Sequence, residues 1–382
     1  MKKSAWFFYF KNSISYLIFS CLKPFFLRKG SKAKRILFIN TGQIGDLLIS
    51  STIFLNVHLF KDYEVFFLVK EKYRELYNDY NGPIKLITWN YLRYKFNLFY
   101  RINFLRQLKS LGFELCVNLT SARGMINDEL SLLSGAVKVY CTNSDWKYLK
   151  KYFGKKMDSI YDGAYSFNLQ NEYEKHIKII EHLTSNKAVG NTGLYIKNQT
   201  FDKARTKLRK IVGDKKILTF ITVAPFTNLQ IKNWNFENYK ELCMKLVEKY
   251  DVPILLIGNK LQRKSLEEIK RLIPDMIINT AGHFSLLESA ALVKLSLIFI
   301  GNDSGFTHIA KALRKKFIGI IGGASYGIFF PYNLTSNEIL LFYPLDCFGC
   351  KWNCIFDKPY CHHNITVENV LEKCSVLMSQ ED

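Results

Sequence analysis

The sequence predicts an α/β protein of two successive domains, each an open parallel sheet covered by helices on both faces. Its 382 residues suit two cores, at about 100–200 residues per domain. Short apolar runs alternate with amphipathic stretches, a pattern typical of parallel sheets, and the alternation begins a second time near Lys216. The composition, 48% hydrophobic and 23% charged, is that of a globular protein.

The expected elements follow the apolar runs. In the first round we expect strands at 36–40, 65–69, 85–88, 115–119 and 137–140, and a helix from about Asp46. In the second we expect strands at 217–223, 254–257, 277–279, 297–301 and 317–321, and helices at 236–250, 260–272, 286–294 and 306–313. The predicted parts are a basic leader (1–34), a first domain (35–190), a second domain (215–345), and a Cys-rich loop with a C-terminal helix (346–382). The polar segment 186–216 is expected to connect the two domains.

The leader is basic and amphipathic. Residues 1–40 hold nine Lys/Arg and no Asp or Glu, and apolar residues recur every three or four positions: Trp6, Phe7, Phe10, Ile14, Leu17, Ile18 and Cys21. Lys11 interrupts the run too early for a spanning helix of ~20 residues, and it breaks the apolar region of a signal peptide. We therefore expect residues 1–30 to lie on an anionic membrane surface; the alternative is a helix packed on the protein itself.

The net charge of +21 favours anionic partners, namely nucleic acid, acidic lipid or phosphorylated glycolipid. No nucleic-acid-binding motif accompanies the charge, so a nucleic-acid partner is not expected.

Ligands of open α/β sheets lie beyond the carboxyl ends of the strands, so the loops after Asn40, Val223 and Gly301 are the candidate sites. In the first loop, two glycines permit a tight turn, and Asp46 is either a helix cap or a base that deprotonates a hydroxyl. The loop lacks G-x-G-x-x-G, which disfavours a dinucleotide oxidoreductase.

The other two loops suit a phosphorylated ligand. After Val223, Lys232 could neutralise a diphosphate leaving group, with Thr227 and Asn228 as hydrogen-bond donors; the alternative is a solvated lysine. After Gly301, the run 303–308 offers hydroxyls and N–H groups at a helix start, with an aspartate to contact a sugar or hold the loop. No Asp-x-Asp occurs in the chain, so we expect no metal on the donor and assign its neutralisation to Lys232 and helix N-termini.

Four of the nine cysteines cluster near the end of the chain, as Cys347-x2-Cys350-x3-Cys354-x6-Cys361, followed by His362 and His363. The spacing matches no standard zinc finger, so free thiols are the favoured interpretation and a zinc site stays open. Either histidine could replace a cysteine as a zinc ligand, but we expect the two histidines to face solvent.

Several runs resemble glycosyltransferase family 9, the lipopolysaccharide heptosyltransferases. They are 36–48, Pro225 through Trp234 (similar to the family's donor loop), 281–288, and 301–308 with 310–313; together they cover roughly residues 35–325. The sequence departs from the family at Gly322-Gly323-Ala324-Ser325 and at 259–262, which leaves the nucleotide and the sugar open.

The resemblance implies a GT-B architecture, with two Rossmann-like domains facing a central cleft, and an inverting transfer from a nucleotide sugar without a metal or other cofactor. It implies Asp46 as general base, with Gly42 and Gly45 in the acceptor-side loop. It implies a donor site made by Thr227, Asn228, Lys232, Asp303, Ser304, Gly305, Thr307 and His308.

The expected function is transfer of a sugar such as a heptose to a lipopolysaccharide or related cell-surface glycan, by a cytoplasmic protein peripheral to the inner membrane. The alternatives are another GT-B enzyme, such as a nucleotide-sugar epimerase, and a non-catalytic nucleotide-sugar or glycan-binding protein.

Overall fold

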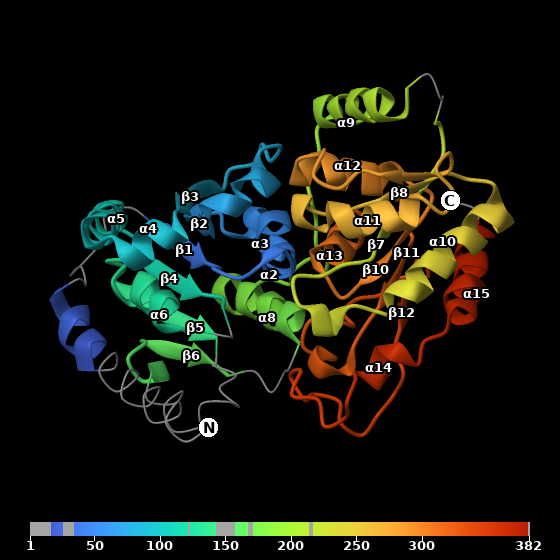
Figure 1. Cartoon of the computed structure of the whole chain (residues 1–382). Coiled ribbons are helices and arrows are strands. Elements are labelled where there is room, and N and C mark those ends of the chain that lie inside the picture. Colours follow the sequence, from blue (N-terminus) through green and yellow to red (C-terminus); the bar gives the residue numbers. More distant parts are fainter. Residues whose placement is uncertain are drawn as a thin grey trace. The chain divides into compact units, whose positions relative to one another are not determined.

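The computed structural model describes residues 17–25, 34–120, 123–142, 157–166, 171–213 and 217–380 (Figure 1). The chain divides into two compact units. Unit 1 comprises Met1–Arg74 and Asn81–Gly190, and unit 2 comprises Glu75–Tyr80 and Asn191–Asp382.

Unit 1 is a parallel sheet with helices. Its described strands are β1 (Arg35–Ile39), β2 (Glu64–Lys70), β3 (Lys85–Trp89), β4 (Leu115–Asn118), β5 (Lys138–Thr142) and β6 (Gly163–Tyr165), in the order β3-β2-β1-β4-β5-β6. Its named helices are α2 (Ile44–Ile49), α3 (Ser51–Leu55), α4 (Tyr91–Phe96), α5 (Leu98–Ser110), α6 (Met125–Leu132) and α8 (Glu172–Thr184), with short 3-10 helices η1 (Val57–Leu59) and η2 (Glu71–Tyr77). The apolar strand residues Leu37, Ile39 and Leu68 pack with residues of α5 and α6 in one core.

Unit 2 repeats this topology. Its described strands are β7 (Ile221–Ala224), β8 (Ile254–Leu256), β9 (Ile277–Asn279), β10 (Phe299–Asn302), β11 (Phe317–Ile320) and β12 (Glu338–Leu341), in the order β12-β11-β10-β7-β8-β9. Its helices are α9 (Asn198–Val212), α10 (Phe236–Tyr250), α11 (Arg263–Lys270), α12 (Leu286–Leu295), α13 (Gly305–Ala312), α14 (Tyr360–His363) and α15 (Val367–Met378), with 3-10 helices η3 (Gln230–Lys232), η4 (Lys260–Gln262) and η5 (Gly323–Ser325). The last helix, α15, lies beside α10 and contributes Val370, Cys374 and Leu377 to the core (Figure 1).

The strand orders determine where ligands bind. In both sheets every described pair of neighbouring strands is parallel. From β1 in unit 1, and from β7 in unit 2, successive strands are added first on one side and then on the other. The switch points lie between β1 and β4 and between β7 and β10. Open α/β sheets bind ligands beyond the carboxyl ends of the strands at such a point. The loops after Asn40, Ala224 and Asn302 all begin there.

The two-unit α/β fold is confirmed, and several element boundaries needed correction. The first helix begins at Ile44 and not near Asp46. The segment 186–216, expected to be a connection, contains α9, which packs on α12. The edge strands β6 and β12 were not expected.

The leader is described only at 17–25, where the chain is helical. Leu17 and Ile18 are exposed, whereas Trp6, Phe7, Phe10 and Ile14 lie outside the described residues. Across the described ranges, no helix has the length and apolar character needed to cross a bilayer.

Candidate functional site

Asp46 lies in the first turn of α2 and accepts a backbone hydrogen bond. Its Oδ2 atom accepts from the Gln43 N–H at 2.7 Å, so Asp46 caps the helix from its third position, and Gln43 rather than Asp46 is the N-cap residue. Gly42 is required beside it, because a Cβ atom there would lie 2.4–2.5 Å from the Asp46 side chain. Asn40 stabilises this loop with two hydrogen bonds. Its Oδ1 accepts from Gly42 N at 2.8 Å, and its Nδ2 donates to Asp46 O at 3.1 Å.

The surroundings of Asp46 favour its protonated form. Burial raises the pKa of this carboxyl, and the negative charge of Glu172 raises it further. The hydrogen bond from Gln43 and the positive charge of Lys70 oppose that shift without cancelling it. A carboxylate with a raised pKa is a stronger proton acceptor than an ordinary aspartate, which suits a general base.

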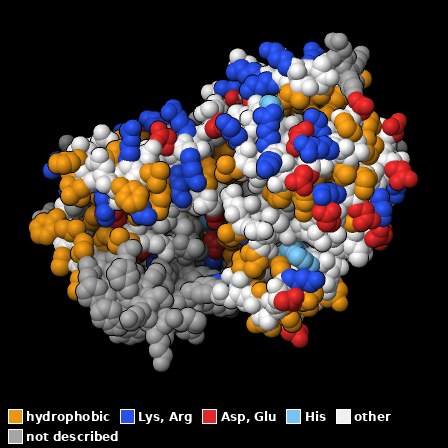
Figure 2. All heavy atoms as spheres, in the orientation of Figure 1, with side chains coloured by type: hydrophobic (Ala, Val, Ile, Leu, Met, Phe, Trp, Pro, Cys, Tyr) orange, Lys and Arg blue, Asp and Glu red, His pale blue; other side chains and the backbone are white. Residues whose placement is uncertain are grey.

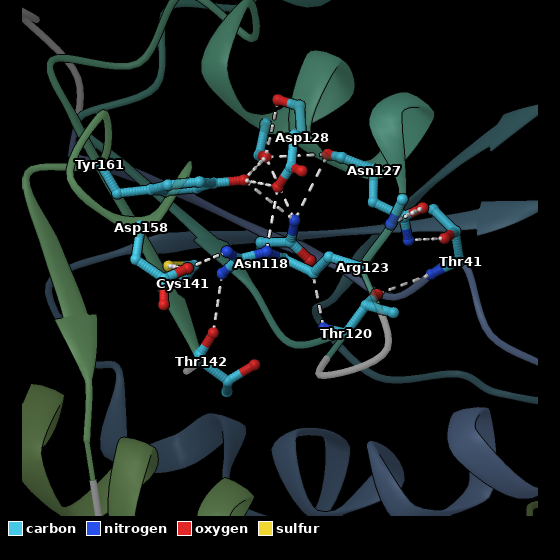
Figure 3. Close-up of polar contacts among 12 residues, drawn as sticks. Thr41, Asn118, Thr120, Arg123, Asn127, Asp128, Cys141, Thr142, Asp158 and Tyr161 are labelled. Carbon is cyan, nitrogen blue, oxygen red and sulfur yellow. Dashed lines mark hydrogen bonds and ion pairs between the residues drawn. The ribbon is translucent and has the colours of Figure 1, made fainter. Parts of the chain in front are cut away.

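A buried polar network lies beside this loop, in the segment that follows β4 (Figure 3). Arg123, only 3% exposed, pairs with Asp128 at 3.0 Å, donates to Thr142 O at 2.7 Å and pairs with Asp158. Tyr161 donates to Asp128 at 2.7 Å. Burial raises the pKa of Asp128, and the guanidinium of Arg123 opposes the shift.

The network is connected to the Asp46 loop through Thr41. The Thr41 N–H donates to Thr120 Oγ1 at 3.4 Å, and Asn127, in the first turn of α6, donates to Thr41 Oγ1 (Figure 3). The two loops at the β1–β4 switch point are therefore held together. Sequence reasoning missed this network, although charged residues within the apolar β4–β5 region were a signal of it.

In unit 2, Asn302 joins the donor loop to β10. Asn302 is fully buried, and its Oδ1 accepts from Trp234 N and Tyr239 OH, each at 3.0 Å. Its Nδ2 donates to Pro225 O at 2.6 Å. One side chain at the end of β10 thus fixes both ends of the loop from 225 to 234. The sequence showed an asparagine here, but not its partners.

Lys232 and Asp303 are brought together, as sequence reasoning placed both in the donor site. Lys232 Nζ lies 3.1 Å from Asp303 Oδ2, and the Trp352 ring centroid lies 5.4 Å from the same nitrogen. Asp303 directly precedes the N-cap of α13, so the ammonium group lies near a helix N-terminus. The ammonium group of Lys232 and the N-terminus of α13 both favour a bound anion.

The start of α13 offers unused donors. Ser304 is the N-cap, and its buried Oγ has no hydrogen-bond partner among the residues that the structure describes. Gly305 is the first helical residue. In the preceding loop, Thr227 Oγ1 donates to Leu229 O at 2.7 Å, whereas the exposed Asn228 side chain makes no hydrogen bond within the described residues.

Thr307 and His308, also predicted for the donor site, are both buried. Thr307 Oγ1 donates to Asn302 O within the turn. His308 is buried, and its ring stacks on Phe330 with centroids 4.3 Å apart. Burial lowers the pKa of His308 to about 4, so this side chain is neutral at pH 7 and adds no positive charge to the site.

The Cys-rich loop contributes to the same site, which sequence reasoning did not foresee. His362 was expected to face solvent but is 1% exposed, and its Nε2 lies 3.0 Å from Ile231 O. Gly322 and Gly323 make room for the loop: a Cβ atom at Gly322 would lie 2.4 Å from Trp352, and one at Gly323 would lie 2.2 Å from Phe348.

The four clustered cysteines are free thiols that line one small cavity with Trp352 and Tyr360. In the described ranges, no three or more His, Cys, Asp or Glu side chains are arranged to hold a metal ion.

Residues 166–353 match the model of glycosyltransferase family 9 (heptosyltransferase). The chain is 28% identical over 123 residues to lipooligosaccharide heptosyltransferase 2 of Haemophilus influenzae, a match that spans 31% of this chain and only 35% of that protein.

Solved structures share the fold. A family 9 glycosyltransferase from Veillonella parvula superposes with a TM-score of 0.73 at 16% identity, over 92% of this chain and 99% of that one. The Escherichia coli ADP-heptose lipopolysaccharide heptosyltransferase II gives 0.68 at 14% identity, over 90% and 98%. An E. coli heptosyltransferase bound to ADP-2-deoxy-2-fluoro heptose gives 0.62 at 14% identity, over 89% and 99%. The family match over residues 166–353, the curated relative and the shared two-domain fold support a glycosyltransferase similar to those of family 9.

Proposed function

We propose that this glycosyltransferase moves a heptose from an ADP-heptose-type donor to a lipopolysaccharide-type acceptor, by an inverting, metal-independent displacement with Asp46 as general base. The names of its relatives support the sugar, the nucleotide and the acceptor class. The observation that carries the mechanism is the placement of Lys232 beside the N-terminus of α13, a site suited to a leaving diphosphate.

On the donor side, the charges and free donors suit a nucleoside diphosphate. Lys232 and the N–H groups at the start of α13 would neutralise the diphosphate as its bond to the sugar breaks. Ser304 Oγ, buried and unpartnered, would donate to a phosphate oxygen. Asp303 orients the Lys232 ammonium. We assign Thr227 and Asn228 to the outer part of the same site, and Gly305 to the turn that lets the phosphate approach.

On the acceptor side, Asp46 would take the proton of the attacking hydroxyl. That oxygen bonds to the anomeric carbon from the face opposite the diphosphate, the bond to the diphosphate oxygen breaks, and the configuration inverts. Gly42 leaves room for the carboxylate, because a Cβ atom there would collide with the Asp46 side chain, and we assign Gly45 to the same acceptor-side loop. The raised pKa of Asp46 supports the assignment, because a base is most effective when its pKa approaches the working pH.

The variant Asp46→Asn tests the base. The amide oxygen can still accept from Gln43 N, so the helix start is preserved. We expect turnover to fall by ~10²–10⁴, while the melting temperature and the affinity for ADP stay unchanged. The assay follows ADP release from ADP-heptose with and without acceptor.

Wild-type turnover in the folded variant would reduce Asp46 to its capping role. Donor conversion without acceptor would support a nucleotide-sugar epimerase instead, and donor binding without any turnover would support a binding protein.

We also propose that the protein works at the cytoplasmic face of the inner membrane, held there by residues 1–30. The excess of basic residues in the leader and the exposed Leu17 and Ile18 support this location. Deleting residues 1–16, which keeps Phe19 in the core and Lys23 paired with Asp162, should weaken vesicle binding and spare transfer to a soluble acceptor fragment. Equal vesicle binding with and without these residues would contradict this attachment.

A further inference from the structure

An exposed apolar face lies on α4 and α5 of unit 1. Leu92, Phe96, Leu98 and Phe99 are 63%, 75%, 65% and 82% exposed. The same two helices bury other apolar residues in the core, namely Tyr94, Phe104, Leu105 and Leu108. The two helices therefore have one apolar face that packs in the core of unit 1 and a second apolar face that is exposed. Figure 2 shows hydrophobic side chains gathered over α4 and α5 at the left margin of the view. Contiguous apolar patches on a protein surface mark interaction sites.

This face is also basic. The stretch 91–113 contains five Lys/Arg and no Asp or Glu. Arg101 is neutralised by Glu129 at 2.6 Å. In contrast, Arg93, Lys95 and Arg106 are exposed and pair with no acidic side chain of the described residues. Their charge is free to attract an anionic surface.

The helix over residues 17–25 extends the same surface. It exposes Leu17, Ile18, Leu22 and Phe25, and Phe25 O accepts from Lys109 Nζ, at the end of α5, at 2.8 Å. Phe19 is buried in the unit 1 core, and Lys23 pairs with Asp162 at 3.1 Å. These contacts fix the helix on unit 1 while its other apolar side chains stay exposed.

We propose that α4, α5 and the helix over 17–25 together form a docking face for an anionic phospholipid bilayer. The docking face consists of the apolar residues Leu17, Ile18, Leu22, Phe25, Leu92, Phe96, Leu98 and Phe99 and the basic residues Arg93, Lys95 and Arg106. Its apolar side chains enter the interfacial region, and its cations contact lipid phosphates. The inference rests on the membrane location proposed above and extends the contact from the leader to α4 and α5 of unit 1.

A second copy of the chain fits this face less well. In a two-fold symmetric dimer the same patch meets itself, so Arg93, Lys95 and Arg106 would face their own like charges without an acidic partner. An anionic lipid surface supplies the complementary charge that the face lacks.

Vesicle sedimentation of the full-length chain tests the docking face. The vesicles contain phosphatidylcholine with about one-third phosphatidylglycerol, or phosphatidylcholine alone. The double variant Phe96→Ser/Phe99→Ser should bind anionic vesicles about a hundredfold more weakly, at about tenfold for each side chain removed from lipid. The matched control Leu218→Ser/Leu261→Ser changes residues of unit 2 that are 74% and 92% exposed, and should bind like wild type.

The charges are tested separately. Arg93→Gln/Lys95→Gln should weaken binding to anionic vesicles by about fivefold for each charge, and added salt should reduce the difference. Equal binding of wild-type protein to neutral and anionic vesicles would overturn the assignment. So would wild-type binding by the Phe96→Ser/Phe99→Ser variant, or a wild-type dimer in solution that this variant converts to a monomer.

Transfer to a soluble acceptor fragment separates this inference from the proposed function. Phe96→Ser/Phe99→Ser should keep wild-type turnover on that substrate while losing vesicle binding. If the wild-type protein transfers no sugar to any fragment, the proposed reaction fails, and the sedimentation results still decide the docking face on their own.

Discussion

Substitution of Asn302 tests how the donor loop, residues 225–234, is held in place. Replacing it with alanine leaves three buried groups without a partner: the Trp234 N–H, the Tyr239 hydroxyl and the Pro225 carbonyl. At about 1 kcal/mol for each unpaired group, the free energy of unfolding of unit 2 should fall by about 3 kcal/mol. In a unit of about 200 residues this lowers the melting temperature by about 6–12 °C.

The loop carries Lys232, so the same substitution should also weaken ADP binding, by about tenfold or about 1.4 kcal/mol. Calorimetric titration with ADP measures this at a temperature where the variant is folded.

Asn279 provides the matched control. It ends β9 and also makes three hydrogen bonds, donating to Arg263 O and Glu267 Oε2 and accepting from Ala281 N, none of them to the donor loop. Asn279→Ala should therefore lower the melting temperature comparably and leave ADP affinity unchanged. The reasoning is refuted if Asn302→Ala melts like wild type, or if both variants lose the same affinity for ADP.

The remaining predictions concern the reaction. As a base, Asp46 works only when deprotonated, so kcat/KM should fall as pH drops through the raised pKa of Asp46. The variant Glu172→Gln removes a negative charge that raises this pKa. It should therefore move the acid limb of the pH profile of kcat/KM to lower pH. If the acid limb of the Glu172→Gln profile stays where it is in the wild type, another group is responsible for that limb. Gly42→Ala should lower kcat at least about tenfold by displacing the Asp46 carboxylate, whereas Gly124→Ala, whose nearest contact is 3.8 Å, should not. Lys232→Ala should weaken ADP binding about 10–100-fold in a titration, the value of a charge-assisted bond. EDTA should leave the transfer rate unchanged; loss restored by Mg²⁺ or Mn²⁺ would contradict the mechanism.

The fold was largely predictable because its strands are buried on both faces. Such strands appear as continuous apolar runs, as at Phe299–Asn302 and Phe317–Ile320. The edge strands lack that signal: Gly163–Tyr165 is half-buried throughout, and Glu338–Leu341 begins with a charged residue. The helix Asn198–Val212 was not predicted because lysines and arginines occupy its exposed face. Their number made the segment resemble a polar connection between domains.

The candidate site was predictable where it follows strand ends and unpredictable where distant segments meet. Lys232 and Asp303 each follow a recognisable strand, and they do form a pair. The approach of Trp352 to Lys232, and of His362 to Ile231, depends on how a loop more than a hundred residues later folds back. No local pattern of residues encodes such an approach. Gly322 and Gly323 were a hint, since they stood out as departures and prove to be where that loop packs.

The position of α15 has a consequence for the order in which the protein is made. Val370, Cys374 and Leu377 complete the core of unit 2, and Trp234 Nε1 donates to Ile365 O at 2.9 Å. These residues are synthesised long after Gly190, where unit 1 ends. Because domains fold in order during synthesis, unit 1 can mature while the chain is still being translated. Unit 2 can finish its core only after α15 has been synthesised, so the Asp46 loop of unit 1 can fold before the core of unit 2 is complete.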